Sequence, residues 1–161
     1  MLNAHGLQQF AMLKDGDCLF SVVAFQLKKR YSMEGIDSPL NQHMRLLGIE
    51  ADKTDIQTIG QTLRELIIKE FLGVHRDELA SYLDLKHCEY FENMANKFVN
   101  RGFFDCELGK ATPLALANVL QIPLVIMSST ENFPVIPVIP RETLTNAAHV
   151  YNVSKDRHRA L

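Results

Sequence analysis

The sequence predicts an α+β fold in which helices pack around a small central β-sheet. Apolar residues recur with helical spacing in several stretches of the chain before residue 121, a pattern typical of amphipathic helices. Short apolar runs of strand length, bounded by turn residues, follow from Ile122 onward. Helices that come first and strands that come later are typical of α+β proteins. Because 161 residues suit one domain, residues 1–161 are expected to form a single domain.

The composition limits the classes to which the protein can belong. It is 47% hydrophobic and 22% charged, which is ordinary for a globular protein. The formal net charge of -2 gives no basic footprint for nucleic acid. No apolar run reaches the roughly 18 residues of a membrane span, and the first residues lack signal-peptide features. We therefore expect a cytoplasmic monomer (in the host cytoplasm for a pathogen protein) that binds neither nucleic acid nor membrane.

The three cysteines, Cys18, Cys88 and Cys106, are an odd number without CxxC spacing. A disulfide scaffold and a thiolate zinc site are therefore not expected, and the sequence implies no metal and no organic cofactor. Free thiols of this kind are typical of a reducing compartment.

The first part of the chain is predicted to be mostly helical. A turn over residues 14–17 precedes a buried helix over residues 18–30, whose acidic start and basic end suit the helix dipole. Residues 31–54 are polar and irregular, which indicates a loop or short helical pieces. Asp55 is a plausible N-cap for a long amphipathic helix that Gly73 closes. Two further helices are predicted over residues 75–83 and 88–100.

The last part of the chain is predicted to change from helix to strand. Residues 102–112 are predicted as a loop, and a helix starts at Pro113 because proline suits the first helical turn. Residues 122–128 are predicted to form a short buried strand. Residues 133–139 contain two prolines and therefore indicate an edge strand or an extended loop. Two more strand candidates lie at residues 148–153 and 158–161.

The sharpest chemical feature is the hexapeptide of residues 15–20, Asp-Gly-Asp-Cys-Leu-Phe. At the start of a helix, Cys18 meets the positive end of the dipole and orphan backbone N–H groups, which stabilise the nucleophilic thiolate. Gly16 permits a tight turn that can aim successive N–H groups at one point, as an oxyanion hole requires. The alternative interpretation is a structural cysteine, because free cysteines are often buried.

A cysteine nucleophile needs a base, which is usually histidine. His149 and His158 lie in the predicted C-terminal strand region, and the end of a strand can deliver a histidine to a helix N-terminus. These two are therefore the candidates. The other four histidines are expected on the surface or at helix ends: His5, His43, His75 and His87.

The hexapeptide resembles the nucleophile motif of the ovarian-tumour (OTU) family of cysteine deubiquitinases, Asp-Gly-(Asn or Asp)-Cys-Leu-Phe. Residues 150–152, Val-Tyr-Asn, followed after five residues by His158, resemble the closing strand, loop and histidine of that family. Between them, residues 102–108 and 114–120 resemble the family's central loop and helix, and residues 122–127 its central strand. The resemblance runs over nearly the whole chain and implies a papain-type cysteine protease fold.

The resemblance implies a role for each matching residue. Cys18 matches the nucleophile, and His158 matches the general base that deprotonates it and later protonates the leaving amine. Asp15 matches the loop aspartate that shapes the turn. The residues that would form the oxyanion hole or flank the substrate channel are Gly16, Asp17, Gly102, Glu107 and Arg157.

One departure from the family pattern lies at Ala160, two residues after His158. The family has an Asp or Asn there, and residues i and i+2 of a strand share a face, so that side chain can orient the imidazole. Asn152 and then Asp15 are the candidates to replace it. His149 stays as a rival base.

The function implied by the resemblance is that of a deubiquitinase, a thiol protease that removes ubiquitin or polyubiquitin chains from lysine side chains without a cofactor. Residues 31–100 are then expected to hold the ubiquitin-binding surface. Two alternatives stay open: a catalytically weak or inactive OTU-like module that binds ubiquitin, and an OTU-type protease that cleaves an unrelated peptide bond.

Overall fold

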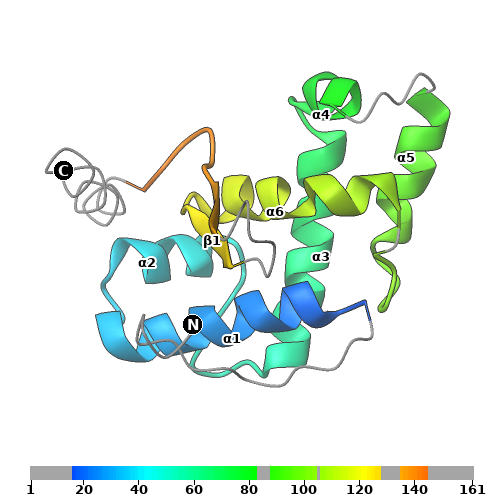
Figure 1. The fold of residues 1–161 in the computed structure, drawn as a ribbon. Helices are drawn as coiled ribbons and strands as arrows, with labels where there is room; N and C mark the ends of the chain where they lie inside the picture. Colours follow the sequence, from blue (N-terminus) through cyan, green and yellow to red (C-terminus); the bar gives the residue numbers. More distant parts are fainter. Residues whose placement is uncertain (1–15, 83–87, 105, 128–134, 145–161) are drawn as a thin grey trace, which may run out of the picture.

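The computed structural model describes residues 16–82, 88–104, 106–127 and 135–144. Over these residues the protein is mostly helical, with six helices and one small antiparallel sheet (Figure 1). The predicted α+β class is therefore confirmed. The strand candidates at residues 148–153 and 158–161 lie outside the described residues. None of the helices within the described ranges combines the length and the apolar character that a membrane span needs.

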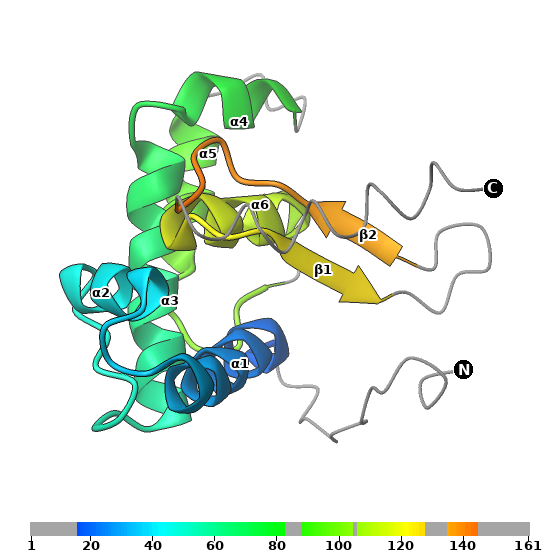
Figure 2. The same ribbon diagram turned by 90° about the vertical axis from the view of Figure 1, so that its left-hand side faces the viewer.

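The helices come first along the chain and the strands come last. Their bounds are α1 (Cys18–Glu34), α2 (Pro39–Leu46), α3 (Ile56–Leu72), α4 (Arg76–Tyr82), α5 (Cys88–Lys97), α6 (Glu107–Leu120), β1 (Leu124–Met127) and β2 (Val135–Val138). The strands pair antiparallel, with Leu124 opposite Val138 and Met127 opposite Val135. Figure 2 shows this sheet extending from the end of α6. Both strands lie within the predicted runs, and α2 is the short helical piece expected between residues 31 and 54. The prediction that the strand within residues 122–128 is buried was wrong, because β1 alternates between half-buried and exposed residues and leaves Val125 and Met127 exposed.

Helix α3 is the element that α1 and α6 both cross (Figure 1). Its N-cap is Asp55, as predicted, and the Asp55 carboxylate accepts a hydrogen bond from the Thr58 N–H at 2.9 Å. The helix closes at Gly73, also as predicted. The fully buried apolar residues of this helix form the middle of the hydrophobic core: Ile59, Leu63, Ile67 and Phe71.

Helix α1 is longer than the sequence predicts. The predicted end lies at Arg30, in a basic last turn, but the helix continues to Glu34 and has no basic residue in its last turn. The reason is that the basic residues have other partners. The Lys28 ammonium donates to the carbonyl of Ala51 at 2.6 Å and to that of Thr54, and Arg30 pairs with Glu34 on the surface.

Helix α6 starts earlier than the sequence predicts. The prediction of a loop over residues 102–112 was wrong in its second half, because α6 begins at Glu107 and Pro113 lies inside it. Proline cannot donate the helical bond to the carbonyl four residues earlier. The helix nevertheless continues through the proline to Leu120, and the Thr112 hydroxyl donates to the Leu108 carbonyl at 3.1 Å. Buried residues lie on both sides of the proline: Leu108, Ala111, Ala115 and Leu120.

Candidate active site

Cys18 is the first residue of α1, and the turn before it places Gly16 directly against Gly102. Gly16 has a φ of 77°, in the left-handed region that favours glycine. A Cβ atom at Gly16 would overlap the carbonyl oxygen of Gly102. The close approach therefore needs glycine, and it leaves the half-buried Cys18 at the positive end of the helix dipole.

The buried carboxylate of Asp17 joins this turn to the loop at Gly102. Its Oδ1 accepts from the Gly102 N–H at 3.0 Å and from Arg64 Nε at 2.9 Å. Its Oδ2 accepts from Arg101 Nε at 3.3 Å. Asp17 is the N-cap residue of α1, yet its side chain makes no capping hydrogen bond to the helix. The carboxylate therefore joins separate segments of the chain and does not cap the helix.

Two opposing influences act on the pKa of Asp17. Burial of the carboxyl by itself raises the pKa, whereas the hydrogen bonds from Gly102, Arg64 and Arg101 lower it. The hydrogen bonds prevail, so the pKa lies below its ordinary value of 3.8. Near neutral pH the Asp17 carboxylate is therefore ionised and forms an ion pair with Arg64.

Arg64 of α3 is the buried partner of this carboxylate, with only 1% of its surface exposed. One terminal nitrogen donates to the Gly16 carbonyl at 2.9 Å. The other donates to the carbonyls of Phe98 at 3.1 Å and Phe103 at 2.9 Å. A single side chain thus connects α3 to the turn before α1 and to the segment between α5 and α6.

Arg64 is not among the site residues predicted from the sequence, although a signal for it exists. Arg64 lies one turn after Gly60 and one turn before Ile67, on the buried face of α3. Arginine is almost never fully buried unless it is paired, so a cation within an apolar helical stripe predicts an ionic partner elsewhere in the chain. Its guanidinium also lies 4.2 Å from the centre of the Phe20 ring, which is a cation–π distance.

A cavity of about 550 Å³ lies beside Cys18 at the N-terminal part of α6. We call it the glycine slot, because Gly16, Gly102 and Gly109 all line it. Its remaining lining residues are Phe104, Cys106 and Lys110. Gly16 and Gly109 also pack closely against the chain's own backbone, because a Cβ atom on them would overlap the carbonyl oxygen of Gly102 or of Phe104.

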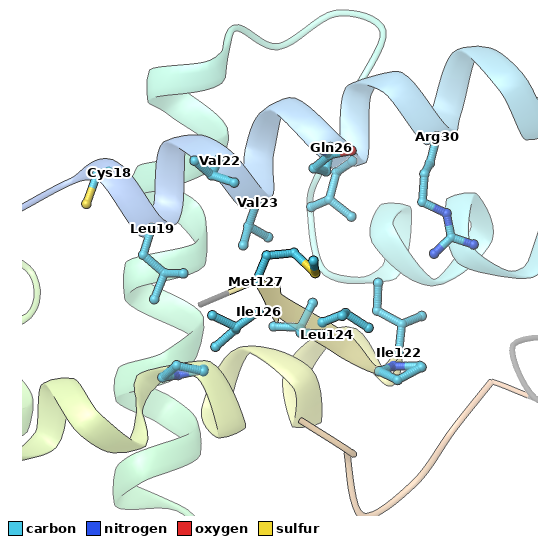
Figure 3. A pocket seen from close by; sticks show the side chains of 14 residues that line it. Cys18, Leu19, Val22, Val23, Gln26, Arg30, Ile122, Leu124, Ile126 and Met127 are labelled. Atoms are coloured by element: carbon cyan, nitrogen blue, oxygen red, sulfur yellow. The ribbon is translucent and has the colours of Figure 1, made fainter. Parts of the chain in front are cut away.

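An apolar groove of about 530 Å³ lies between α1 and β1 and also reaches Cys18 (Figure 3). The α1 wall includes Leu19 and Val23, and all of β1 contributes to the opposite wall. Figure 3 shows Cys18 toward one end of the groove and Arg30 toward the other. Cys18 is thus accessible from two hollows, the glycine slot and this groove.

The structure brings four of the site residues named from the sequence into one cluster: Gly16, Asp17, Cys18 and Gly102. Glu107 is the first residue of α6, and its carboxylate pairs at 2.9 Å with Lys110, a lining residue of the slot. The other site residues named from the sequence lie outside the described residues: Asp15, Asn152, Arg157, His158 and the rival base His149.

No metal centre is evident in the described ranges, where no three His, Cys, Asp or Glu side chains are placed to hold an ion. Comparison with known proteins gives no match: no protein-family model matches the chain, and no curated protein or solved structure is significantly similar to it. The structure shows a mostly helical α+β fold with a two-stranded antiparallel sheet, and the OTU resemblance rests on the sequence motifs.

Proposed function

We propose that this protein is a thiol isopeptidase of the OTU type, which removes ubiquitin or a similar modifier from lysine side chains. The observation that carries the proposal is the position of Cys18. It begins α1 directly after a turn held against Gly102, and it lines both the glycine slot and the apolar groove. The hexapeptide around Cys18 and the spacing to His158 support the same activity.

In the proposed reaction the Cys18 thiolate attacks the carbonyl carbon of the modifier's terminal glycine. The bond from this carbon to the lysine nitrogen then breaks, His158 gives its proton to the leaving amine, and a thioester forms on Cys18. His158 next deprotonates a water molecule that attacks the thioester. The modifier leaves with a free carboxylate, and Cys18 regains its thiol proton through His158.

The start of α1 suits the negative charge of the tetrahedral intermediate. The first N–H groups of a helix have no partners within the helix, and the dipole adds partial positive charge there. The side chain of Asp17 makes no capping bond to them, because its carboxylate binds Arg64 and Gly102. We therefore assign the oxyanion hole to the backbone that leads through Gly16 and Asp17 to Cys18.

The glycine slot supports a substrate tail that ends in glycine. A Gly-Gly tail presents only main chain, and we assign it to the glycine slot, which Cys18 also lines. The body of a ubiquitin-sized modifier needs a total interface of roughly 1,200–2,000 Å². We assign that surface to residues 31–100, which include α2 to α5.

The orientation of the base is the point at which the proposal departs from the family pattern. Ala160 cannot bond the His158 ring through its side chain, so we assign the orienting role to Asn152 first and Asp15 second. Ala160 also favours a second candidate function, in which the chain is a catalytically inactive OTU-like module that binds ubiquitin.

Hydrolysis of ubiquitin that carries a fluorescent amine at its C-terminus tests the proposed function. We expect the wild type and Cys88→Ala to release the amine, and Cys18→Ala and His158→Ala to release none. Loss of release in His149→Ala but not in His158→Ala would make His149 the base. A folded wild type that binds ubiquitin without releasing the amine would overturn the isopeptidase in favour of the binding module.

A further inference from the structure

Arg64 contacts two separate segments of the chain around the candidate active site. Its guanidinium donates to the Gly16 carbonyl and the Asp17 carboxylate before α1, and to the carbonyls of Phe98 and Phe103 between α5 and α6. We propose that Arg64 is a positioning residue that holds the turn before the nucleophile in its reactive geometry. This inference rests on the proposed isopeptidase function.

The burial of this charge is not explained by stability alone. Well-packed apolar side chains commonly stabilise a protein as much as a buried ion pair of similar volume does. A guanidinium differs from them in geometry, because its five donors lie in one rigid plane. In Arg64 that plane reaches one carboxylate and three carbonyls. It therefore fixes the distances from α3 to all of these groups at once.

The contacts of Asp17 transmit the effect of Arg64 to the nucleophile. Asp17 Oδ1 accepts from Arg64 and from the Gly102 N–H, so one oxygen joins α3 to the loop. The Asp17 carbonyl accepts the first helical bond of α1, from the Ser21 N–H at 2.9 Å. Cys18 is the next residue, so any displacement of Asp17 moves the start of the helix and its N–H groups.

Arg64 also neutralises a charge beside the reacting atoms. The Asp17 carboxylate lies one residue before Cys18, and an unpaired carboxylate there would repel the negative charge of the thiolate and of the oxyanion. The ion pair with buried Arg64, together with the more exposed Arg101, offsets that repulsion. The same side chain therefore serves both the geometry and the electrostatics of the turn.

The test compares Arg64→Lys with Ile67→Ala in the full chain. Lysine keeps the positive charge but loses the planar fork of five donors. Ile67→Ala leaves a cavity on the same buried face of α3 and serves as the matched control for lost packing. Two properties are measured. The first is kcat and KM for release of the amine from ubiquitin. The second is the hydrogen-exchange rate of the Gly102 amide, which donates a hydrogen bond to Asp17 Oδ1.

We expect Arg64→Lys to lower kcat about tenfold or more with KM within about twofold, because a small misplacement of reacting groups can cost about a hundredfold in rate. The Gly102 amide should exchange about tenfold faster than in Ile67→Ala. A folded Arg64→Lys variant that matches Ile67→Ala in kcat and in Gly102 exchange would overturn the inference.

Should Arg64→Lys not fold, the double variant Arg64→Met with Asp17→Asn provides the test. It removes both charges, so no unpaired charge stays buried, and asparagine keeps an oxygen acceptor for Gly102. Slower turnover and faster Gly102 exchange support the inference, and wild-type values of both overturn it. The exchange measurement needs no substrate. If the wild type does not cleave ubiquitin but the Gly102 amide still exchanges faster in the Arg64 variant, the proposed function is overturned and the positioning role of Arg64 is not.

Discussion

Gly16 and Gly102 lie against each other so closely that a Cβ atom on Gly16 would overlap the Gly102 carbonyl oxygen. Both residues have a φ of 77°, which favours glycine over any residue with a side chain. The contact sets the turn before Cys18 directly on the loop that leads into α6. Two independent steric reasons thus fix the residue type at Gly16.

Gly16→Ala should therefore lower the free energy of unfolding by about 2–4 kcal/mol, through backbone strain and overlap together. Gly48→Ala is the matched control, since Gly48 has a φ of 79° and open space around a Cβ atom. Strain alone should cost that variant about 1–2 kcal/mol. Urea unfolding followed by circular dichroism measures both, and equal losses in the two variants would contradict the contact.

Asp17 should contribute stability that depends on pH. Burial raises its pKa, but Gly102, Arg64 and Arg101 bring it below 3.8, so the folded state favours the ionised carboxylate. Such a contribution is present above the unfolded-state pKa and is lost as the pH falls through the lower folded-state pKa. The stability difference between the wild type and Asp17→Asn should shrink in urea titrations as the pH is lowered from about 6 to about 3. A difference that grows toward acid would refute this reading.

Lys28→Met should destabilise the protein more than Lys29→Met does. The Lys28 ammonium donates to the Ala51 and Thr54 carbonyls, whereas Lys29 is exposed on the same helix. Hydrogen bonds from charged groups are worth about 1.5–3 kcal/mol, and surface substitutions change stability by less than about 0.5 kcal/mol. Thermal unfolding of the two variants measures the difference, and similar midpoints would count against the tether between α1 and the loop before α3.

Two helical glycines should respond to alanine in opposite directions. A Cβ atom at Gly60 would lie 3.6 Å from the Phe20 Cβ, which is an ordinary contact, so Gly60→Ala should raise stability by about 0.5–1 kcal/mol. A Cβ atom at Gly109 would overlap the Phe104 carbonyl oxygen, so Gly109→Ala should lower stability by about 1–3 kcal/mol. The unfolding free energies of both variants are measured against the wild type, and a Gly109→Ala variant that is no less stable than the wild type would contradict the contact between Gly109 and Phe104.

Local signals allowed part of the fold to be predicted from the sequence. Helix α3 is bounded by Asp55 and Gly73. The Asp55 carboxylate caps the first turn, and Gly73 suits the end because a Cβ atom there would lie 2.8 Å from the Lys69 carbonyl oxygen. The end of α1 could not be predicted in this way. Lys28 suits the C-terminal end of a helix dipole, but its carbonyl partners lie at Ala51 and Thr54, more than twenty residues later in the chain.

The candidate site, too, could be predicted only where it depends on residues close together in the sequence. The glycine turn before Cys18 could be predicted, because Gly16 and its neighbours are consecutive in the sequence. The partner of Asp17 could not, because Arg64 lies on another helix and Gly102 lies on a distant loop. The start of α6 was missed for a different reason: Pro113 favours a helix start locally, while the buried Leu108 before it extends the helix.

The most direct test of the central claim uses ubiquitin with a thiol-reactive electrophile in place of its C-terminal carboxylate. We predict a single covalent adduct with the wild-type protein, located on Cys18 by peptide mass spectrometry and absent from Cys18→Ala. Cys88 and Cys106 should carry no label. A folded wild type that forms no adduct, or an adduct that persists in Cys18→Ala, would contradict the role of Cys18 as the nucleophile.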